Sequence, residues 1–296
     1  MTDTWTIGSL LQWTEKFFAG KGIDTPRLDA EILLAFVLGK ERIYLYAHYD
    51  EPLMAAELAA YKEKIKLRAE RCSVAHILGV KPFMGHDFIV SGDVLIPRPE
   101  TELLVETVIA AAPQDAPLHV LDMGTGSGAV ILRVTASGAV ILSVLAYFTH
   151  AAGTGVDISP AALAVARQNG ENLGIDRVTW CESDVYENLT VGEHYDWILS
   201  NPPYLTADDM NHLEPEVRRD PQTALFGGDD GLDIYRRIAA GAALYLKTGG
   251  KCALEVGAGQ APDVADIFTN TGEFGLAAVR RDYGGIERVV LLEKKG

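Results

Sequence analysis

Cysteine is scarce in this chain, with three residues in 296, and this scarcity excludes several classes of protein. Cys72, Cys181 and Cys252 lie far apart and form no Cys-x-x-Cys pair. We therefore expect reduced core residues, and neither a disulfide framework nor a metal site. The seven histidines are scattered without the spacing of metal ligands. This usage is typical of a cytoplasmic protein.

Basic residues are also in the minority. The chain has 26 Lys and Arg against 41 Asp and Glu, which gives a formal net charge of −15. Because a nucleic-acid-binding surface normally shows clustered Lys and Arg, we expect no direct nucleic-acid partner. A basic or neutral protein partner fits this charge better.

The sequence shows no feature that requires a membrane. Residues 1–11 contain Asp3 and no basic segment of the kind that opens a signal peptide. Residues 129–148 form an apolar run with a single charge, Arg133, and approach a membrane-spanning length. Because this run contains Ser and Thr and follows directly on a glycine-rich loop, we expect a buried helix that carries an insertion, and no contact with a membrane.

The chain is long enough for about two domains of ~150 residues each. Residues 1–75 have a helical pattern. Asp24-Thr25-Pro26 supplies a helix start, the pattern from 28 to 38 is amphipathic, and Gly39 ends it. A second helix is expected over 54–71. We interpret this region as a substrate-recognition domain, with a purely structural cap as the alternative.

Residues 76–97 have a different pattern, and we expect a β-hairpin linker there. Strands at 88–90 and 94–96 would flank the turn residues Ser91-Gly92-Asp93. Residues 98–296 then alternate between helices and strands, which indicates an α/β domain with a mostly parallel sheet. The strands are expected near 118–123, 152–157, 177–181, 195–200, 251–256, 276–281 and 286–293. The helices are expected after residue 102 to about 112 and near 127–148, 160–173, 231–246 and 260–270.

Asn201-Pro202-Pro203-Tyr204 follows the apolar run 197–200 and places a rigid turn at the carboxyl end of a predicted strand. Open α/β sheets bind their ligands at that edge. The prolines have no N–H, so the turn offers carbonyl acceptors, to which Asn201 adds an amide oxygen and Tyr204 a flat ring. Acceptors beside a ring suit a planar NH2 group, so the turn predicts methylation of an amide or exocyclic amine nitrogen. A polyproline turn or a ligand for a proline-binding domain is the alternative.

A second group of residues predicts a nucleotide-like cofactor. The predicted strand 119–123 leads into a glycine-rich loop, which lets a ligand approach the backbone closely. Three acids at strand ends favour S-adenosylmethionine: Asp122 for the cationic methionine part, Asp157 for the ribose and Asp184 for the adenine amine. A helix N-cap is a further role for Asp157, and an ordinary loop residue is the alternative for Asp184. The predicted cofactor-binding residues are Asp122, Gly124, Thr125, Gly126, Ser127, Gly128, Asp157, Ile158, Asp184, Val185 and Asn201.

With these motifs together, nearly the whole chain resembles the HemK/PrmC-type protein-(glutamine-N5) methyltransferases that act on peptide chain release factors. The resemblance depends on residues 96–102 (Ile-Pro-Arg-Pro-Glu-Thr-Glu), 122–128, 200–204 and 220–232. It implies a helical N-terminal domain, a hairpin linker and a Rossmann-like S-adenosylmethionine-dependent domain, at 1–75, 76–97 and 98–296. It also implies that the protein substrate is the release factor, and separately we expect a monomer.

The resemblance assigns roles to the residues of the turn. The target is the glutamine amide of the release factor's Gly-Gly-Gln motif, held by Asn201-Pro202-Pro203-Tyr204, with Asn201, Pro202 and Tyr204 as the catalytic residues. The resemblance places Arg98 and Glu100 at a lid or at the edge of the substrate. A surface ion pair is the alternative for these two residues.

One feature departs from the family pattern. Residues 127–132 (Ser-Gly-Ala-Val-Ile-Leu) recur unchanged at 137–142, ten positions later. Asp157 lies 29 positions after Gly128, whereas an acid ~20 positions beyond the glycines is usual for such loops. We therefore interpret ten residues as duplicated. Because ten is not a whole number of helical turns, we expect a looped-out or remodelled segment, with the first copy kept in register with the glycine loop.

The sequence is compatible with several functions. The duplication is either a tolerated insertion or the cause of impaired cofactor binding. The Asn-Pro-Pro-Tyr turn also fits a glutamine methyltransferase of a ribosomal protein, and nucleic-acid amino-methyltransferases have the same turn. A non-catalytic binding protein is the alternative from a different class, and measurable cofactor binding would distinguish it from the enzymes.

Overall fold

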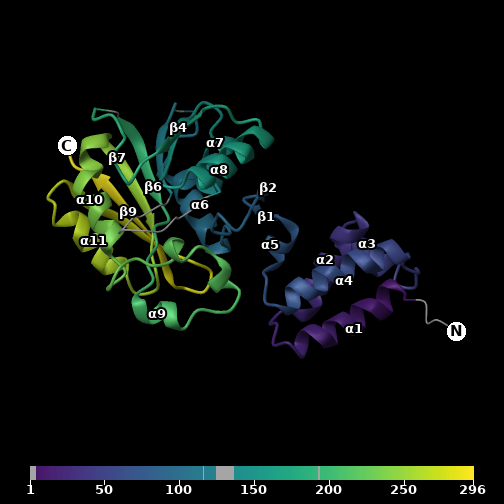
Figure 1. The fold of residues 1–296 in the computed structure, drawn as a ribbon. Coiled ribbons are helices and arrows are strands. Elements are labelled where there is room, and N and C mark those ends of the chain that lie inside the picture. The colour runs from purple at the N-terminus through teal and green to yellow at the C-terminus, as the bar shows by residue number, and fades with distance from the viewer. Residues whose placement is uncertain (1–4, 116, 125–136, 193) are drawn as a thin grey trace. The chain divides into compact units, whose positions relative to one another are not determined.

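The computed structural model of the protein describes residues 5–115, 117–124, 137–192 and 194–296. The chain divides into two compact units, residues 1–80 and 81–296 (Figure 1). The predicted helical region falls in the first unit, and the predicted α/β region falls in the second.

Five helices make up most of the first unit in the part that the structure describes, residues 5–80. Pro26 begins the second helix and Gly39, at φ 62°, ends it, as the sequence predicts. Leu33, Leu34 and Tyr61 are fully buried in the core of the unit. The helices are α1 (Ile7–Ala19), α2 (Pro26–Leu38), α3 (Arg42–Ala47), α4 (Ala55–Ala69) and α5 (Val74–Leu78).

A two-stranded hairpin follows, formed by β1 (Val80–Phe83) and β2 (His86–Ile89). β2 overlaps the strand predicted at 88–90, but 94–96 forms no strand, so the predicted hairpin around Ser91-Gly92-Asp93 is wrong. Met84 and Gly85 form the turn, both with positive φ, which matches the twist of paired strands. Ser91-Gly92-Asp93 forms a separate local turn, in which the Asp93 N–H donates to Ser91 Oγ at 3.1 Å.

The second unit is built on one seven-stranded sheet, as predicted. Its order is β5-β4-β3-β6-β7-β9-β8. The pairs β3–β4, β4–β5, β3–β6 and β6–β7 are parallel, and β9 pairs antiparallel with both β7 and β8. Successive strands are added on one side of β3 up to β5 and then on its other side from β6, so the strand order changes direction between β3 and β6. Open α/β sheets bind ligands at such a point. The strands are β3 (His119–Met123), β4 (Ala152–Asp157), β5 (Val178–Glu182), β6 (Tyr195–Ser200), β7 (Leu246–Glu255), β8 (Phe274–Arg281) and β9 (Glu287–Lys294).

Helices cover both faces of this sheet (Figure 1). Alternate strand residues point to opposite faces, so Trp197 and Leu199 pack in one core cluster while Ile198 packs in the other. α6 (Glu102–Ala111) and α7 (Ala139–Tyr147) pack in the cluster of Trp197, and α10 (Asp233–Tyr245) and α11 (Ala261–Thr269) in the cluster of Ile198. The remaining helices are α8 (Pro160–Asn172), which packs on β4 and β5, the short α9 (Ala207–Asn211), and the 3₁₀ turns η1 (Pro99–Thr101), η2 (Val217–Arg219) and η3 (Gln222–Ala224).

The helix expected over 127–148 is described only as α7, residues 139–147. The first copy of the repeated hexapeptide lies outside the described residues, and the second copy forms the start of α7. Among the described residues, no helix has both the length and the apolarity needed to span a membrane.

Candidate active site

The carboxyl ends of β3, β4, β5 and β6 meet at one edge of the sheet, and predicted site residues follow each of them. Asp122 lies in β3, Asp157 ends β4, Asp184 comes two residues after β5, and Asn201 directly follows β6. Parallel pairing brings these ends together, since Asp122 is level with Leu199 of β6 and with Gly155 of β4. The sheet therefore places the two predicted halves of the site, for substrate and for cofactor, side by side.

The Asn-Pro-Pro-Tyr turn is held from several sides. Ser200 Oγ donates to the Met123 carbonyl and so ties the end of β6 to the end of β3. Beyond the turn, the Leu205 N–H donates to the Leu225 carbonyl at 2.8 Å, and the Gly227 N–H donates back to the Leu205 carbonyl at 2.8 Å. These bonds fix the turn on both sides, and its last carbonyl, that of Tyr204, accepts from Gln260 Nε2 at 3.1 Å.

The Asn201 side chain has a defined orientation. Its Nδ2 donates to Thr101 Oγ1 at 3.0 Å, from η1 at the start of α6. The amide oxygen of Asn201 is therefore on the side away from Thr101, as an acceptor. Pro202 and Pro203 are buried and Tyr204 is half-buried, with burial raising the pKa of its hydroxyl to about 12.

A pocket of about 350 Å³ opens at this turn. Asn201, Pro202 and Tyr204 line it together with Arg98, so four of the predicted substrate-binding residues share one cavity. Pro203 and Glu100 are not among its lining residues, and Glu100 is exposed. The remaining lining residues come from the segments before η1 and after the turn: Leu95, Leu205, Asp209, His212, Leu213, Glu214, Val217, Ala224 and Leu225.

Arg98, which lines the pocket, has a buried acidic partner. Its Nη2 lies 3.5 Å from Oδ2 of the buried Asp220. Burial raises the pKa of Asp220 to about 6, and the charge of Arg98 opposes that rise. The predicted alternative of a surface ion pair is wrong for Arg98, because its partner is buried. Asp220 belongs to the family-like stretch 220–232.

Glu255, at the end of β7, is a residue that sequence reasoning missed. It is 1% exposed, and burial raises the pKa of its carboxyl to about 7. A hydrogen bond from Thr101 and the charges of Arg288 and Arg98 oppose this rise. Thr101 therefore connects Glu255 to Asn201. The signal in the sequence was an acid at the end of an apolar strand, the same pattern that marked Asp157.

The cofactor half of the site contains buried acids. Asp122 is 4% exposed, and burial raises its pKa to about 7. The Ile141 backbone N–H lowers that pKa, and the charge of Asp157 raises it. Asp157 Oδ1 accepts from the Ser159 N–H at 2.8 Å, and Ser159 caps α8. The expected N-cap role of Asp157 is therefore wrong.

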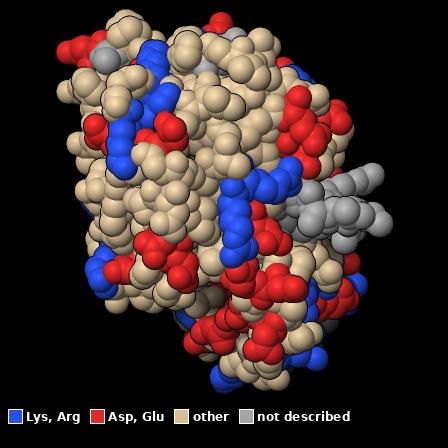
Figure 2. All heavy atoms as spheres, turned by 90° about the vertical axis from the view of Figure 1, so that its left-hand side faces the viewer, with Lys and Arg blue, Asp and Glu red and all other residues tan. Residues whose placement is uncertain are grey.

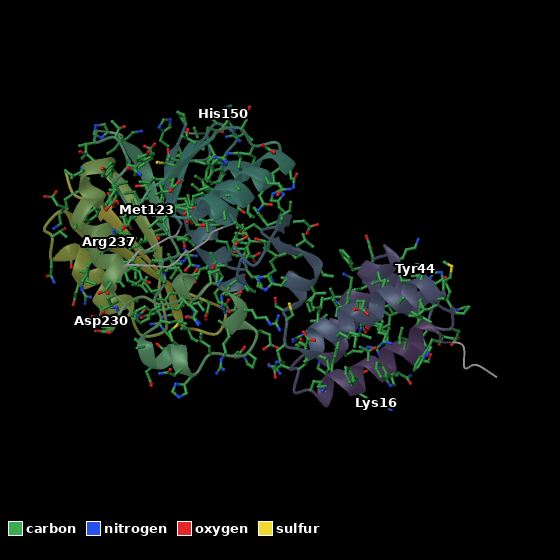
Figure 3. All side chains as sticks on the ribbon, viewed as in Figure 1. Lys16, Tyr44, Met123, His150, Asp230 and Arg237 are labelled. Carbon is green, nitrogen blue, oxygen red and sulfur yellow. The ribbon has the colours of Figure 1, made fainter. Side chains whose placement is uncertain are left out.

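The last predicted cofactor-binding acid, Asp184, has a basic partner on α10. Asp184 Oδ1 lies 2.7 Å from Arg237 Nη2, on α10. Figure 3 labels Arg237 and also Met123 at the end of β3. Val185, which follows Asp184, has φ 55°, a strained value for a β-branched residue. Ile158, which follows β4, is half-buried. Of the glycine loop only Gly124 is described; Thr125, Gly126, Ser127 and Gly128 lie outside the described residues.

Comparison with known proteins identifies the family. Residues 9–79 match the family model described as PrmC N-terminal domain, and residues 114–280 match the one described as methyltransferase domain. The release factor glutamine methyltransferase of Geobacter sulfurreducens is 42% identical over 289 residues, which covers 97% of this chain and 96% of the relative. The chain belongs to the release factor glutamine methyltransferase family.

A second relative supports this assignment, and a solved structure shows the same fold. The release factor glutamine methyltransferase of Rhodopirellula baltica is 36% identical over 98% of this chain and 97% of its own length. A solved methyltransferase structure from Pyrococcus furiosus, 16% identical, matches the fold with a TM-score of 0.51 and covers 72% of this chain and 90% of that one. The Rossmann-like fold predicted from the sequence is confirmed.

The cofactor of this enzyme family is S-adenosylmethionine, and the site fits it. Asp122 Oδ1 is buried and has no hydrogen-bond partner among the described residues, as expected for a carboxylate that binds a cationic ligand. Among the described residues there is no group of three or more His, Cys, Asp or Glu side chains that could hold a metal ion.

Proposed function

We propose that this protein transfers a methyl group from S-adenosylmethionine to the side-chain amide nitrogen of the glutamine in the Gly-Gly-Gln motif of peptide chain release factors. The observation that carries the proposal is the orientation of Asn201, whose Nδ2 is bound to Thr101 and whose oxygen is left as an acceptor. The name and full-length similarity of the relatives support release factors as the substrate.

The chemistry needs the amide to be positioned. When bound, S-adenosylmethionine supplies an electrophilic methyl group. An amide nitrogen is a poor nucleophile because its lone pair is delocalised into the carbonyl. Asn201 Oδ1 and the Pro202 carbonyl would each accept one N–H of the substrate amide, which fixes the amide plane. Tyr204 would pack against that plane, and positioning of this kind can supply ~7–11 kcal/mol of a barrier.

The pocket accounts for the roles proposed for the neighbouring charged residues. Arg98 lines the same cavity as Asn201 and pairs with buried Asp220, so its guanidinium group is fixed at the edge where a peptide substrate would enter. We assign Arg98 to the substrate edge. Glu100 is exposed beside η1, which suits contact with the protein substrate outside the cavity.

The first unit offers a surface that suits a substrate-recognition role. A groove of about 540 Å³ lies between α1 and α4, with Trp13 and Phe17 stacked at 5.2 Å along it and Trp5 edge-on to Trp13. Lys21, Lys62 and Lys66 also line it. We propose that this groove binds an acidic, amphipathic surface of the release factor, since exposed aromatic residues bordered by lysines complement one.

The acidic charge of the protein supports the proposal that it has no direct nucleic-acid partner. Acidic and basic side chains lie next to one another on the face shown in Figure 2, and the net charge is −15. We propose a cytoplasmic monomer that acts on a protein and does not bind nucleic acid directly.

Replacing Asn201 tests whether this residue holds the substrate amide and not the cofactor. Asn201→Ala should abolish transfer to a Gly-Gly-Gln peptide while its calorimetric affinity for S-adenosylmethionine stays close to that of the wild type. Equal loss of transfer and of cofactor binding would contradict the role given to Asn201. A ribosomal-protein glutamine substrate methylated in preference to the release factor would replace the proposed substrate.

A further inference from the structure

The repeated segment is longer than a hexapeptide. Residues 127–136 and 137–146 are identical at eight of ten positions. They differ only where the first copy has Arg133 and Thr135 and the second has Ser143 and Leu145. Because the two copies are nearly the same, either could in principle form the first helix of the cofactor fold.

The second copy forms that helix. Ile141, Leu142 and Leu145 of α7 are each fully buried against the sheet. The contact with the sheet is close: a Cβ atom on Gly153 of β4 would lie 2.7 Å from Ile141 Cδ1. The place of the first helix of the cofactor fold, against β3 and β4, is therefore filled by residues 139–147.

The two differing positions explain why the second copy is the better fit. Ser143 is 4% exposed and Leu145 is 0% exposed in α7. The first copy in the same place would bury the charge of Arg133 and the hydroxyl of Thr135 there. Burial of an unpaired charge is strongly unfavourable, so the sequence difference selects the second copy.

The turn that leads into α7 is also tightly fixed. Gly138 has φ 75°, and a Cβ atom there would lie 3.0 Å from both Ala166 Cβ and Trp180 Cη2. Asn169 Nδ2 donates to the Ser137 carbonyl at 2.9 Å. The same amide is bonded to both backbone groups of Ile89, so α8 and β2 hold the turn in place.

Two buried polar groups at this turn point to a ligand. Ser137 is 2% exposed, and its Oγ has no partner within the described part of the chain. Asp122 Oδ1 is also buried without a partner in that part of the chain. The Asp122 carboxyl does accept a hydrogen bond from the Ile141 N–H, in the first turn of α7. Helix starts present further N–H donors, so the turn combines donors, a hydroxyl and a carboxylate.

We propose that Ser137 and Gly138 of the second copy, and not Ser127 and Gly128 of the first, form the loop-to-helix turn that contacts S-adenosylmethionine. The inference rests on the proposed methyltransferase function for the identity of the ligand. It replaces the expectation that the first copy serves as the cofactor turn. On this account residues 127–136 are an insertion between Gly126 and a complete cofactor turn.

The repeat supplies its own matched controls, because the same substitution can be made in identical local sequence ten residues apart. Gly138→Val should lower the melting temperature of the ligand-free protein, and it should weaken calorimetric binding of S-adenosylmethionine at least ~10-fold, since the added atoms have no space. Gly128→Val should leave both quantities close to those of the wild type. Equal effects of the two variants, or the larger effect at Gly128, would overturn the proposal.

A second pair of variants, with smaller changes, tests the proposal even if Gly138→Val does not fold. Ser137→Ala removes only a hydroxyl, so it should weaken binding of S-adenosylmethionine without lowering the melting temperature, and Ser127→Ala should change neither. Unchanged binding by Ser137→Ala together with weaker binding by Ser127→Ala would overturn the proposal. Transfer to a Gly-Gly-Gln peptide is measured separately. If the binding pattern holds and no transfer occurs, the proposed function fails and the inference about the turn is supported.

Discussion

Asn201 Nδ2 donates to Thr101 Oγ1 across 100 residues of sequence, at 3.0 Å. Thr101 in turn donates to the buried carboxyl of Glu255. A hydroxyl that donates to a carboxylate is left as an acceptor, so Asn201 must present its NH2 to Thr101 and its oxygen to the pocket. The orientation of the residue proposed to hold the substrate therefore depends on a neighbour from η1.

Removal of the Thr101 hydroxyl tests this dependence. In Thr101→Val the Asn201 amide loses its fixed partner, and because one net hydrogen bond contributes ~0.5–1.5 kcal/mol, kcat for methyl transfer should fall ~2- to 10-fold. Affinity for S-adenosylmethionine should not change. Thr101→Ser keeps the hydroxyl and should retain activity; a Ser variant as impaired as the Val variant would argue for a packing role.

The same connection predicts a pH dependence of the rate. The pKa of Glu255 is raised to about 7, so its carboxyl becomes protonated as the pH falls below that value. Protonated Glu255 no longer requires the Thr101 hydrogen, and the Asn201 amide loses its imposed orientation. The rate should therefore decline below about pH 7, and Glu255→Gln should have a low, flat profile. A profile of Glu255→Gln that still declines through pH 7 would assign the titration to another group.

Stability should show the opposite trend. Because the pKa of Glu255 is higher in the folded state than its ordinary value of 4.5, its favourable contribution is fully present below pH 4.5 and is lost as the pH rises through about 7. Glu255→Gln removes that loss, so the free energy of unfolding of the variant relative to the wild type should increase from pH 5 to pH 8, on the order of 1 kcal/mol or more. Urea denaturation at the two pH values measures it, and a constant difference would show that Glu255 does not titrate between pH 5 and pH 8 in the folded protein.

The aromatic groove of the first unit predicts a difference between substrates. Trp13→Ala removes an exposed ring that stacks on Phe17, and it should raise KM for an intact release factor ~10-fold, as loss of an interface anchor does. It should leave KM for a short Gly-Gly-Gln peptide unchanged. Ile43→Ala, an exposed apolar residue of the same unit outside the groove, is the control. A rise in KM for both substrates would place the effect in the active site.

Deletion of residues 127–136 tests whether the duplication impairs the enzyme. The deleted chain retains one complete hexapeptide directly after Gly126, and because residues 139–147 already fill the helix position, the fold should be kept. We expect a melting temperature at least equal to that of the wild type and equal or tighter binding of S-adenosylmethionine. A deletion variant that does not fold would show that the ten residues are part of the structure.

Much of the fold could be predicted from the sequence, because period and breaker residues act locally. The apolar strand before Asn201, the proline at the start of α2 and the alternation of strands and helices all gave correct elements. The hairpin was misplaced because Ser91-Gly92-Asp93 is as good a turn sequence as Met84-Gly85. Only pairing in three dimensions decides between them.

The candidate site was predictable where a motif marked it. Asn201 and Arg98 line one pocket, as the motifs implied. The connection from Asn201 through Thr101 to Glu255 was not predictable, since it joins three segments that meet only in the folded sheet. The partner of Asp184, Arg237, was missed for the same reason. The repeat was visible in the sequence, but the choice between its copies depended on which positions of α7 are buried.

The most direct measurement is mass spectrometry of a release factor after incubation with the wild-type protein and S-adenosylmethionine. We expect a mass gain of one methyl group on the glutamine of the Gly-Gly-Gln motif, and no gain in a release factor with glutamate at that position. A folded wild-type protein that binds S-adenosylmethionine and leaves that glutamine unmodified would contradict it.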